Sequence, residues 1–253
     1  MRLRSPGGNE CPMPNDSIAR REGGGRVLRI RHLNISLPLY FIYPMTSDHF
    51  ALPTAVDWSH WLLQSRVQPG DWVVDATAGN GHDSLFLAGL VGAAGRVFVF
   101  DVQETAIVAT RRRLESAGVL ERCELIHAGH EHMSTRLPED SRGQLTAVMF
   151  NLGWLPGHDK KCITNTETTM SALVQALESL RPSGLLTVVV YPGHAGGDEE
   201  SQTIAVWASA LASNTHEVRH TRSPNRQKRS PECWAIRKRQ TKPDNQARNS
   251  GDV

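Results

Sequence analysis

An acidic residue followed by a glycine-rich turn forms a pattern that could bind a cationic ligand. The stretch "VVDATAGNGHD" places Asp75 at the end of an apolar run. The turn behind it consists of Gly79, Asn80, Gly81 and His82. Glycine permits a tight backbone turn and lets a ligand approach without a Cβ in the way. A helix that begins here directs its free N–H groups at the same place.

A second acid and further residues could complete a nucleoside site. Asp101 ends the apolar run "RVFVFD", where a carboxylate can accept both hydroxyls of a ribose. Gln103 could reach the adenine, and Gly129 and His130 in "HAGHEH" could flank its ring. The third glycine of the dinucleotide fingerprint is missing, because Ser84 stands there. The pattern favours the sulfonium and ammonium of S-adenosylmethionine over a nicotinamide cofactor, although each acid alone is also typical of a helix cap.

The elements that must position these residues alternate in type beyond residue 53. Strands are predicted at "DWVVDA", "GRVFVFD", "CELIHA", "QLTAVMFN", "LLTVVVYPG", "THEVRHTR" and "ECWAIRKR". Helical patterns precede the first strand and follow the first, second, fourth and fifth. Such alternation indicates parallel βαβ units. We therefore predict a doubly wound, Rossmann-like α/β fold with a mostly parallel seven-stranded sheet and an antiparallel C-terminal strand. Ligands of such sheets bind beyond the carboxyl ends of the strands.

The chain of 253 residues divides into three segments by composition. Residues 1–52 are rich in turn formers, and we predict a disordered or mis-annotated extension, with Met45 as an alternative start. A targeting segment is disfavoured, because Gly23 to Gly25 interrupt its seven arginines. Residues 53–240 are predicted to form the folded domain with the S-adenosylmethionine site, hence a methyltransferase domain, and residues 241–253 a disordered, basic and polar tail.

Metal, disulfide and membrane-spanning features are not predicted. The four cysteines lie far apart and form no CxxC pair. The histidines of "HAGHEH" are not spaced to complete a set of metal ligands. Apolar stretches stay well below the ~20 residues needed to cross a bilayer. We expect a protein of the reducing cytoplasm without a metal or a membrane partner.

Five stretches together carry a family resemblance: "DATAGNGHDSLFLA", "FDVQ", "NLGWLPGHDK", "ETT" and "YPGHAGG". They resemble the bacterial rRNA methylase family of class I S-adenosylmethionine-dependent methyltransferases, over about residues 55–238. The resemblance implies the class I methyltransferase fold and S-adenosylmethionine as cofactor. It also implies tRNA as substrate, because studied members methylate the aminomethyl group of a wobble uridine (mnm5s2U). Two departures are Trp154, where the family usually has tyrosine, and His158, where it often has glycine.

The loop that begins at Asn151 is similar to the Asn-Pro-Pro-Tyr loop of amino-methylating enzymes. The Asn151 side-chain oxygen and a loop carbonyl could accept the N–H bonds of an amine, which leaves its lone pair pointing at the methyl group. Trp154 could stack on the base or cover the developing cation. We assign Leu152 and Gly153 to substrate binding in the same loop.

An alkyl ammonium must lose a proton before it can attack, so the site needs a base or a water path. Asp159 and His194 are the candidates. Asp159 fits equally well as the partner of Lys160 or as a helix cap, and His194 equally well as lining of the substrate pocket. The sequence leaves these alternatives open, and we count Asp159 as catalytic and His194 as substrate-binding.

The C-terminal end is strongly basic, which suits a phosphate backbone. Ten lysines and arginines lie between residues 219 and 248, against two acids; a solvated terminus is the alternative. We expect N-methylation of the aminomethyl wobble uridine in tRNA, bound through its anticodon stem-loop, with a homodimer left open. The alternatives are an rRNA or small-amine acceptor, or a non-catalytic RNA-binding protein, against which Asp75, Asp101 and Asn151 argue.

Overall fold

The computed structural model describes residues 19–22, 25–30, 35–38, 52–153, 165–193, 196–225 and 230–240, the first three ranges as backbone alone. It divides into two units, residues 1–52 and residues 53–253. Each unit is described by itself.

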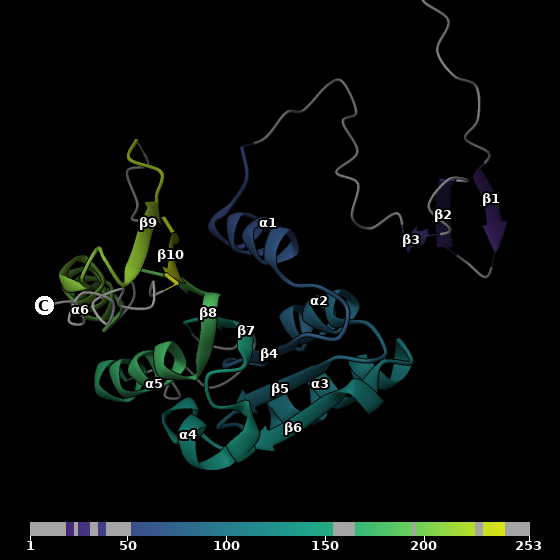
Figure 1. Cartoon of the computed structure of the whole chain (residues 1–253), viewed down its shortest axis with the longest axis horizontal. Coiled ribbons are helices and arrows are strands. Elements are labelled where there is room, and N and C mark those ends of the chain that lie inside the picture. Colours follow the sequence, from purple (N-terminus) through teal and green to yellow (C-terminus); the bar gives the residue numbers. More distant parts are fainter. Residues whose placement is uncertain are drawn as a thin grey trace, which may run out of the picture. The chain divides into compact units, whose positions relative to one another are not determined.

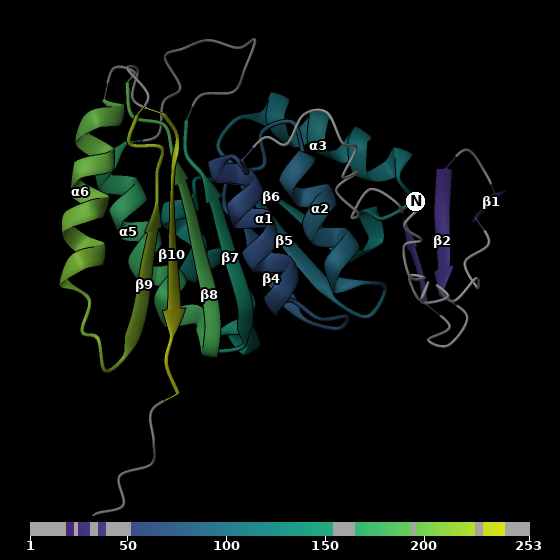
Figure 2. The same ribbon diagram turned by 90° about the horizontal axis from the view of Figure 1, so that it is seen from above.

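A seven-stranded sheet forms the centre of the second unit (Figures 1 and 2). Its strands are β4 (Trp72–Asp75), β5 (Arg96–Asp101), β6 (Cys123–His127), β7 (Leu145–Asn151), β8 (Leu180–Val190), β9 (His216–Thr221) and β10 (Glu232–Lys238). They lie in the order β6-β5-β4-β7-β8-β10-β9. The pairs from β6 to β8 are parallel, and β10 runs antiparallel to both of its neighbours. The predicted sheet and its antiparallel C-terminal strand are therefore confirmed.

Helices cover both faces of this sheet (Figure 2). On one face lie α1 (Ala55–Arg66), α2 (His82–Val91) and α3 (Glu104–Ser116), which contribute to one cluster of buried apolar side chains. On the other lie α4 (Met133–Arg136), α5 (Thr166–Ser179) and α6 (Gly197–Ala210), which contribute to a second cluster. Short 3-10 turns at Leu120–Arg122, His130–His132 and Glu139–Ser141 complete the described elements.

The alternation of side chains along the central strands explains the two clusters. Val97 and Val99 of β5 pack toward the α1–α3 face, whereas Phe98 and Phe100 pack toward the opposite face. All four are fully buried, and burial of one such side chain stabilises the fold by about 1.5–3 kcal/mol. A strand that is apolar on both faces belongs in the middle of a covered parallel sheet. The carboxyl ends of these rigid strands carry the predicted site.

Polar caps fix where two of the helices begin. At α1, the Thr54 hydroxyl accepts a hydrogen bond from the Asp57 N–H at 3.2 Å, and the Asp57 carboxylate accepts one from the Thr54 N–H at 2.8 Å. At α5, the Asn165 side-chain oxygen accepts the Glu167 N–H at 2.9 Å. The reciprocal pair at α1 and the single bond at α5 satisfy N–H groups that a helix start leaves unpaired. In α2 no side chain performs this task, and its first residues follow the glycine turn.

The first unit contains three short strands, β1 (Ala19–Glu22), β2 (Gly25–Ile30) and β3 (Ile35–Pro38), paired antiparallel in that order. The disordered or mis-annotated extension predicted for residues 1–52 stays a prediction. The tail predicted for residues 241–253 lies outside the described residues. Within the described part of the chain, no helix has the length and apolarity needed to cross a membrane.

We expect deletion of residues 1–44 to change the melting temperature of the second unit by no more than about 2 °C. The reason is that both buried clusters of that unit are formed between Leu63 and Ile236. Thermal unfolding of the full chain and of the truncated chain, followed by circular dichroism, measures the difference. A decrease of about 5 °C or more would show that the removed segment packs on the domain.

Candidate active site

The glycine-rich turn connects β4 to α2 at the carboxyl end of the sheet. Gly79 and Gly81 have φ angles of 54° and 76°, in the left-handed region that glycine enters without strain. A Cβ on Gly81 would lie 2.8 Å from the Thr110 Cα of α3, closer than any side chain could tolerate. The turn is therefore pressed against α3, and glycine is required at this position for two independent reasons.

Asp75 lies behind this turn. Its side chain is fully buried, and its two oxygens accept hydrogen bonds from the Ser84 hydroxyl at 2.5 Å and from the Thr77 N–H at 3.1 Å. Burial, and then the negative charge of Asp83, raise the pKa of the Asp75 carboxyl to about 7. Ser84, the residue in place of the third fingerprint glycine, thus anchors α2 to β4. The contact of Asp75 with a cofactor stays a prediction, because both of its oxygens have partners within the protein.

Asp101 joins the turn to the neighbouring strand. One oxygen accepts the Gly79 N–H at 2.9 Å and the other accepts the Gln103 N–H at 2.8 Å. A carboxylate offers about four lone-pair positions, so each oxygen can accept a further hydrogen bond. The side chains of Asp101 and Gln103 are partly exposed, which suits the ribose and adenine contacts predicted for them.

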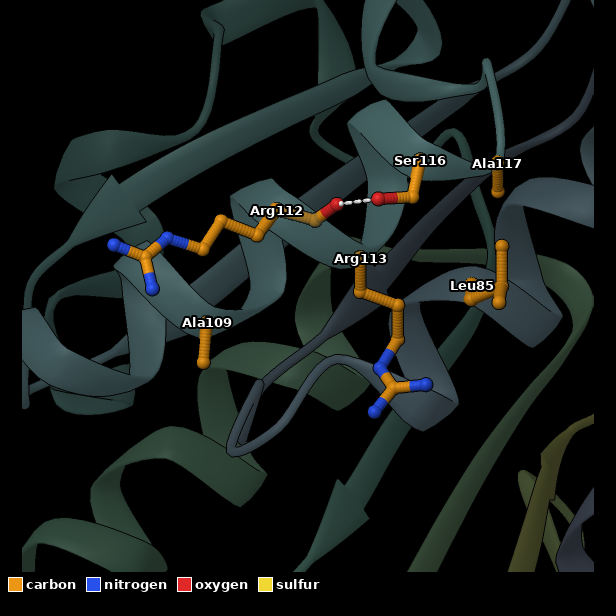
Figure 3. A pocket seen from close by; sticks show the side chains of 6 residues that line it. All are labelled: Leu85, Ala109, Arg112, Arg113, Ser116 and Ala117. Atoms are coloured by element: carbon orange, nitrogen blue, oxygen red, sulfur yellow. Dashed lines mark hydrogen bonds between the residues drawn. The ribbon is translucent and has the colours of Figure 1, made fainter.

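The outer side of the turn is held by α3. The Arg113 Nε donates to the Asn80 carbonyl at 2.6 Å, and its terminal nitrogen lies 3.0 Å from His82 Nε2. Because a guanidinium only donates, His82 Nε2 acts as the acceptor. Arg113 also borders an open pocket of about 480 Å³ between α2 and α3 (Figure 3), lined in addition by Leu85, Ala109, Arg112, Ser116 and Ala117. None of the predicted site residues lines that pocket.

His130 lies beside the end of β4, next to the turn. Its Nδ1 is 3.3 Å from the Ala76 carbonyl oxygen, so Nδ1 carries the proton. Burial lowers the pKa of His130, and the neutral ring keeps a buried Nε2 lone pair without a partner in the described part of the chain. The ring packs edge-on against Phe150. A Cβ on Gly129 would meet the Glu131 carboxylate, the far end of a flexible side chain. The predicted contacts of both residues with adenine stay predictions.

Asn151 ends β7 and is held at two positions. Its N–H donates to the Thr77 hydroxyl at 2.8 Å, and its side-chain Nδ2 donates to the Asp83 carboxylate at 2.9 Å. Tyr191 lies beside the same side chain. The Oδ1 atom is buried and has no partner among the described residues. Among the described residues, the predicted catalytic asparagine therefore presents an unsatisfied acceptor beside the glycine-rich turn.

Two loop residues predicted to bind substrate have different surroundings. Leu152 is fully buried in the apolar cluster on the α4–α6 face, and its N–H donates to the Val189 carbonyl at 2.8 Å. Its side chain therefore packs in the core. Its backbone carbonyl is the group that could still contact a substrate. Gly153 lies against the ring of Tyr191, where a Cβ would be 3.5 Å from a ring carbon. Trp154, Asp159 and His194 lie outside the described residues, and their roles stay predictions.

The sequence did not single out Asp83 and Tyr191, which lie beside Asn151, or His60, which lies beside Asp83. Asp83 closes the stretch "GNGHD" and Tyr191 opens "YPGHAGG", so both stood inside motifs that carried the resemblance. His60 lies in α1, and its sequence context gives no signal. The histidines of "HAGHEH" face different groups; for example, His127 lies 3.0 Å from the Val102 carbonyl. Among the described residues, no three His, Cys, Asp or Glu side chains converge to hold a metal ion.

Three carboxylates make the surroundings of the turn negative: Asp75, Asp83 and Asp101. The charges of the last two raise the pKa of Asp75, so they act on the same small region. Negative charge at this position repels a pyrophosphate and attracts a sulfonium and an ammonium. The residues present therefore fit S-adenosylmethionine and do not fit a dinucleotide.

Comparisons with known proteins identify the family of the chain. The family described as "Putative rRNA methylase" matches residues 97–237. The chain is 39% identical over 170 residues to a chloroplastic tRNA (mnm5s2U34)-methyltransferase of Arabidopsis thaliana. That match covers 64% of this chain and 61% of the relative, so the chain spans about three fifths of that protein's length.

Two solved structures share both sequence and fold with the chain. A "putative rRNA-methylase" from Clostridium thermocellum is 38% identical, with a TM-score of 0.71 over 75% of this chain and 100% of the other. A "putative methyltransferase" from Streptococcus mutans, solved in complex with SAH, is 31% identical, with a TM-score of 0.67 over 74% of this chain and 99% of the other. These structures confirm the predicted fold class.

Replacement of Gly81 by alanine is expected to weaken cofactor binding by at least about tenfold. Alanine is strained at φ 76°, and its Cβ would push the turn away from Thr110. Gly118→Ala is the matched control, because Gly118 has φ 65° with open space around it. Both variants should lose about 1–2 kcal/mol of stability, but Gly118→Ala should bind S-adenosylmethionine like wild type in calorimetry. Equal affinity of all three proteins would contradict this assignment of the turn.

Asp101→Ala should weaken S-adenosylmethionine binding by about 1.5–3 kcal/mol, the typical value of a hydrogen bond to a charged group. Glu104→Ala is the control, since Glu104 is an exposed acid in the first turn of α3 and lacks a predicted ligand contact. Calorimetric titration of both variants at equal ionic strength measures the difference. If Asp101→Ala binds as tightly as wild type, Asp101 does not belong to the cofactor site.

Proposed function

Because the chain belongs to the "putative rRNA methylase" family of class I S-adenosylmethionine-dependent methyltransferases, we propose that it N-methylates the aminomethyl group of a modified wobble uridine in tRNA. One observation carries the proposal. Among the described residues, the Asn151 Oδ1 is a buried hydrogen-bond acceptor without a partner, at the end of the strand next to the glycine-rich turn. An amine nucleophile supplies the N–H donor that such an acceptor lacks.

The residues of the turn would hold the cofactor. The fully buried Asp75 shapes the turn from behind, Asp101 offers its remaining lone pairs to the ribose, and the free N–H groups at the start of α2 face the turn. S-adenosylmethionine, when bound, supplies an electrophilic methyl group on a sulfonium. The carboxylates near the turn stabilise that positive charge by their negative potential.

Asn151 would align the acceptor. With Oδ1 accepting one amine N–H, the lone pair of the nitrogen is free to point away from the asparagine and toward the methyl group. Orientation of this kind contributes up to ~7–11 kcal/mol to the lowering of a barrier. Trp154 would cover the base, and Asp159 or His194 would take the proton that the amine must lose; these three roles rest on the resemblance and on residue chemistry alone.

A tRNA substrate is supported by the name of the Arabidopsis relative and by the position of the basic segment. Val190 at the end of β8 pairs with Glu232, and Cys233 pairs with Thr221, so the β9–β10 connection leaves the sheet at the same edge as Asn151. That connection starts with the exposed Arg222. Arg226, Lys228 and Arg229, which continue the basic run, lie outside the described residues. Cationic side chains at this edge would bind RNA phosphates, which a small-amine substrate does not require.

Binding through the anticodon stem-loop follows from the wobble position of the target and belongs to the same proposal. The homodimer stays an open prediction. The cytoplasmic location also stays a prediction, and the Arabidopsis relative is named as a chloroplast protein. An rRNA acceptor is the second candidate, favoured by the family's description alone.

Asn151→Ala is expected to lower the rate of methyl transfer by about a hundredfold or more, as does loss of other positioned polar groups. Cofactor affinity should change little, because the contact is made to the nucleophile. Single-turnover transfer from labelled S-adenosylmethionine into tRNA lacking only this methyl group measures the rate, and nucleoside analysis identifies the product. Asn214→Ala is the control, since Asn214 is exposed and precedes β9 at the opposite edge of the sheet.

Two results would contradict the proposal. Label in rRNA or in a small amine, but not in the wobble nucleoside of tRNA, would assign the enzyme a different acceptor. If Asn151→Ala methylates the correct nucleoside at the wild-type rate, Asn151 has a structural role only, and its assignment as a catalytic residue is wrong.

A further inference from the structure

Asp83, which has so far entered only through its charge, is buried between Asn151 and a histidine from another helix. It belongs to the first turn of α2 and is 7% exposed. Its Oδ2 accepts the Asn151 Nδ2 hydrogen at 2.9 Å, and its Oδ1 lies 2.7 Å from His60 Nε2. The segments of these three residues lie far apart in sequence, so only the fold brings them together.

The chemistry of the carboxylate decides which way the Asn151 amide faces. An ionised carboxylate accepts hydrogen bonds and cannot donate them, so the amide NH2 must face Asp83 and the oxygen must face away. Burial, and then the charge of Asp83, raise the pKa of Tyr191, so its phenol stays protonated beside the same amide. Oδ1 is left as the one atom of this side chain without a partner in the described part of the chain.

His60 holds the carboxylate from the opposite side. Its ring stacks on Phe86 of α2, with ring centres 3.9 Å apart and planes 11° apart. Since Asp83 can only accept, His60 Nε2 is the donor in this pair. The histidine therefore fixes the Asp83 carboxylate and attaches α1 to the start of α2, with 27% of its own side chain exposed.

We propose that Asp83 is a positioning residue for methyl transfer: it orients the Asn151 amide so that Oδ1 receives the substrate amine, and His60 fixes Asp83 for this task. The inference rests on the proposed function, because it concerns the same amine. Without the carboxylate, the amide can turn by 180° about its last side-chain bond. Its NH2 would then meet the N–H groups of the amine, and the nucleophile would lose its alignment.

A double-mutant cycle tests whether Asp83 acts through Asn151. Asp83→Asn alone should lower the single-turnover rate on tRNA about tenfold or more, with the KM for tRNA changed less than about threefold, because the contact aligns a group that already binds. In the Asn151→Ala background, Asp83→Asn should lower the rate by less than about threefold, since the group it orients is gone. Additive effects would overturn the inference and make Asp83 an independent base or charge.

Asp71→Asn is the matched control for the loss of a buried, paired aspartate. The Asp71 side chain is 11% exposed, against 10% for Asp83, and it pairs with Arg181 at 3.1 Å before the start of β4, at the other edge of the sheet. The control should keep the wild-type rate. A decrease equal to that of Asp83→Asn would make the effect a general loss of stability and would overturn the positioning role.

A second pair of variants tests the hydrogen bond that His60 donates to Asp83, without replacing Asp83 itself. His60→Gln keeps an N–H donor near Oδ1 of Asp83, and His60→Leu removes it. The leucine variant should lower the single-turnover rate about fivefold or more, whereas the glutamine variant should stay within about twofold of wild type. Equal rates of the two variants would overturn the proposed role of His60, and these variants remain informative if Asp83→Asn does not fold.

The amide orientation also has a readout without any substrate. In a 1H–15N spectrum, the side-chain NH2 signals of Asn151 are identified by their absence in Asn151→Ala. They should shift in Asp83→Asn and stay unchanged in Asp71→Asn, because only the first variant removes their charged acceptor. Unshifted signals in Asp83→Asn would overturn the inference. A shift together with no methylation of tRNA by the wild type would instead reject the proposed function and keep the orientation of the amide.

Discussion

The buried hydrogen bond between Asp75 and Ser84 is the interaction on which the rest of the site depends. It fixes the start of α2 against the end of β4 at an oxygen–oxygen distance of 2.5 Å. Ser84 and Asp83 are neighbours in the first turn of α2, so the register that turns Ser84 toward Asp75 also turns Asp83 toward Asn151 and His60. A helix shifted by one residue would lose both contacts, because successive side chains point about 100° apart around the axis.

The register of the parallel sheet determines which side chains a ligand can reach. Asp75 is opposite Val99 on β5 and opposite Met149 on β7. Asp101 and Asn151 therefore both lie two residues farther along their strands than Asp75, one on each side of it. This offset explains why Asp75 is fully buried while its two neighbours are partly exposed. The central strand thus anchors the turn, and the flanking strands carry the groups proposed to contact the cofactor and the acceptor.

Local sequence predicted the sheet and the acids at the strand ends, because both follow from side-chain alternation and from the rule that ligands bind at carboxyl ends. It could not predict the pair of Asp83 with His60, since that contact depends on how α1 packs on α2. It assigned Leu152 to the substrate because of its position in a loop motif, whereas the β7–β8 pairing extends to its N–H and its side chain completes the core. A motif identifies which residues belong to a site, and packing decides which of their atoms face it.

The charge of the site connects stability with cofactor choice. A carboxyl whose pKa is raised from 3.8 to about 7 by burial favours its protonated form in the folded protein. Its contribution to stability is present below its ordinary pKa and is lost as the pH rises through about 7. Near neutral pH this acid cluster is therefore costly to ionise fully. A cation in the turn would reverse this balance, because it would stabilise ionised Asp75 together with Asp83 and Asp101. The same burial that disfavours full ionisation near neutral pH favours a positively charged ligand over an anionic one.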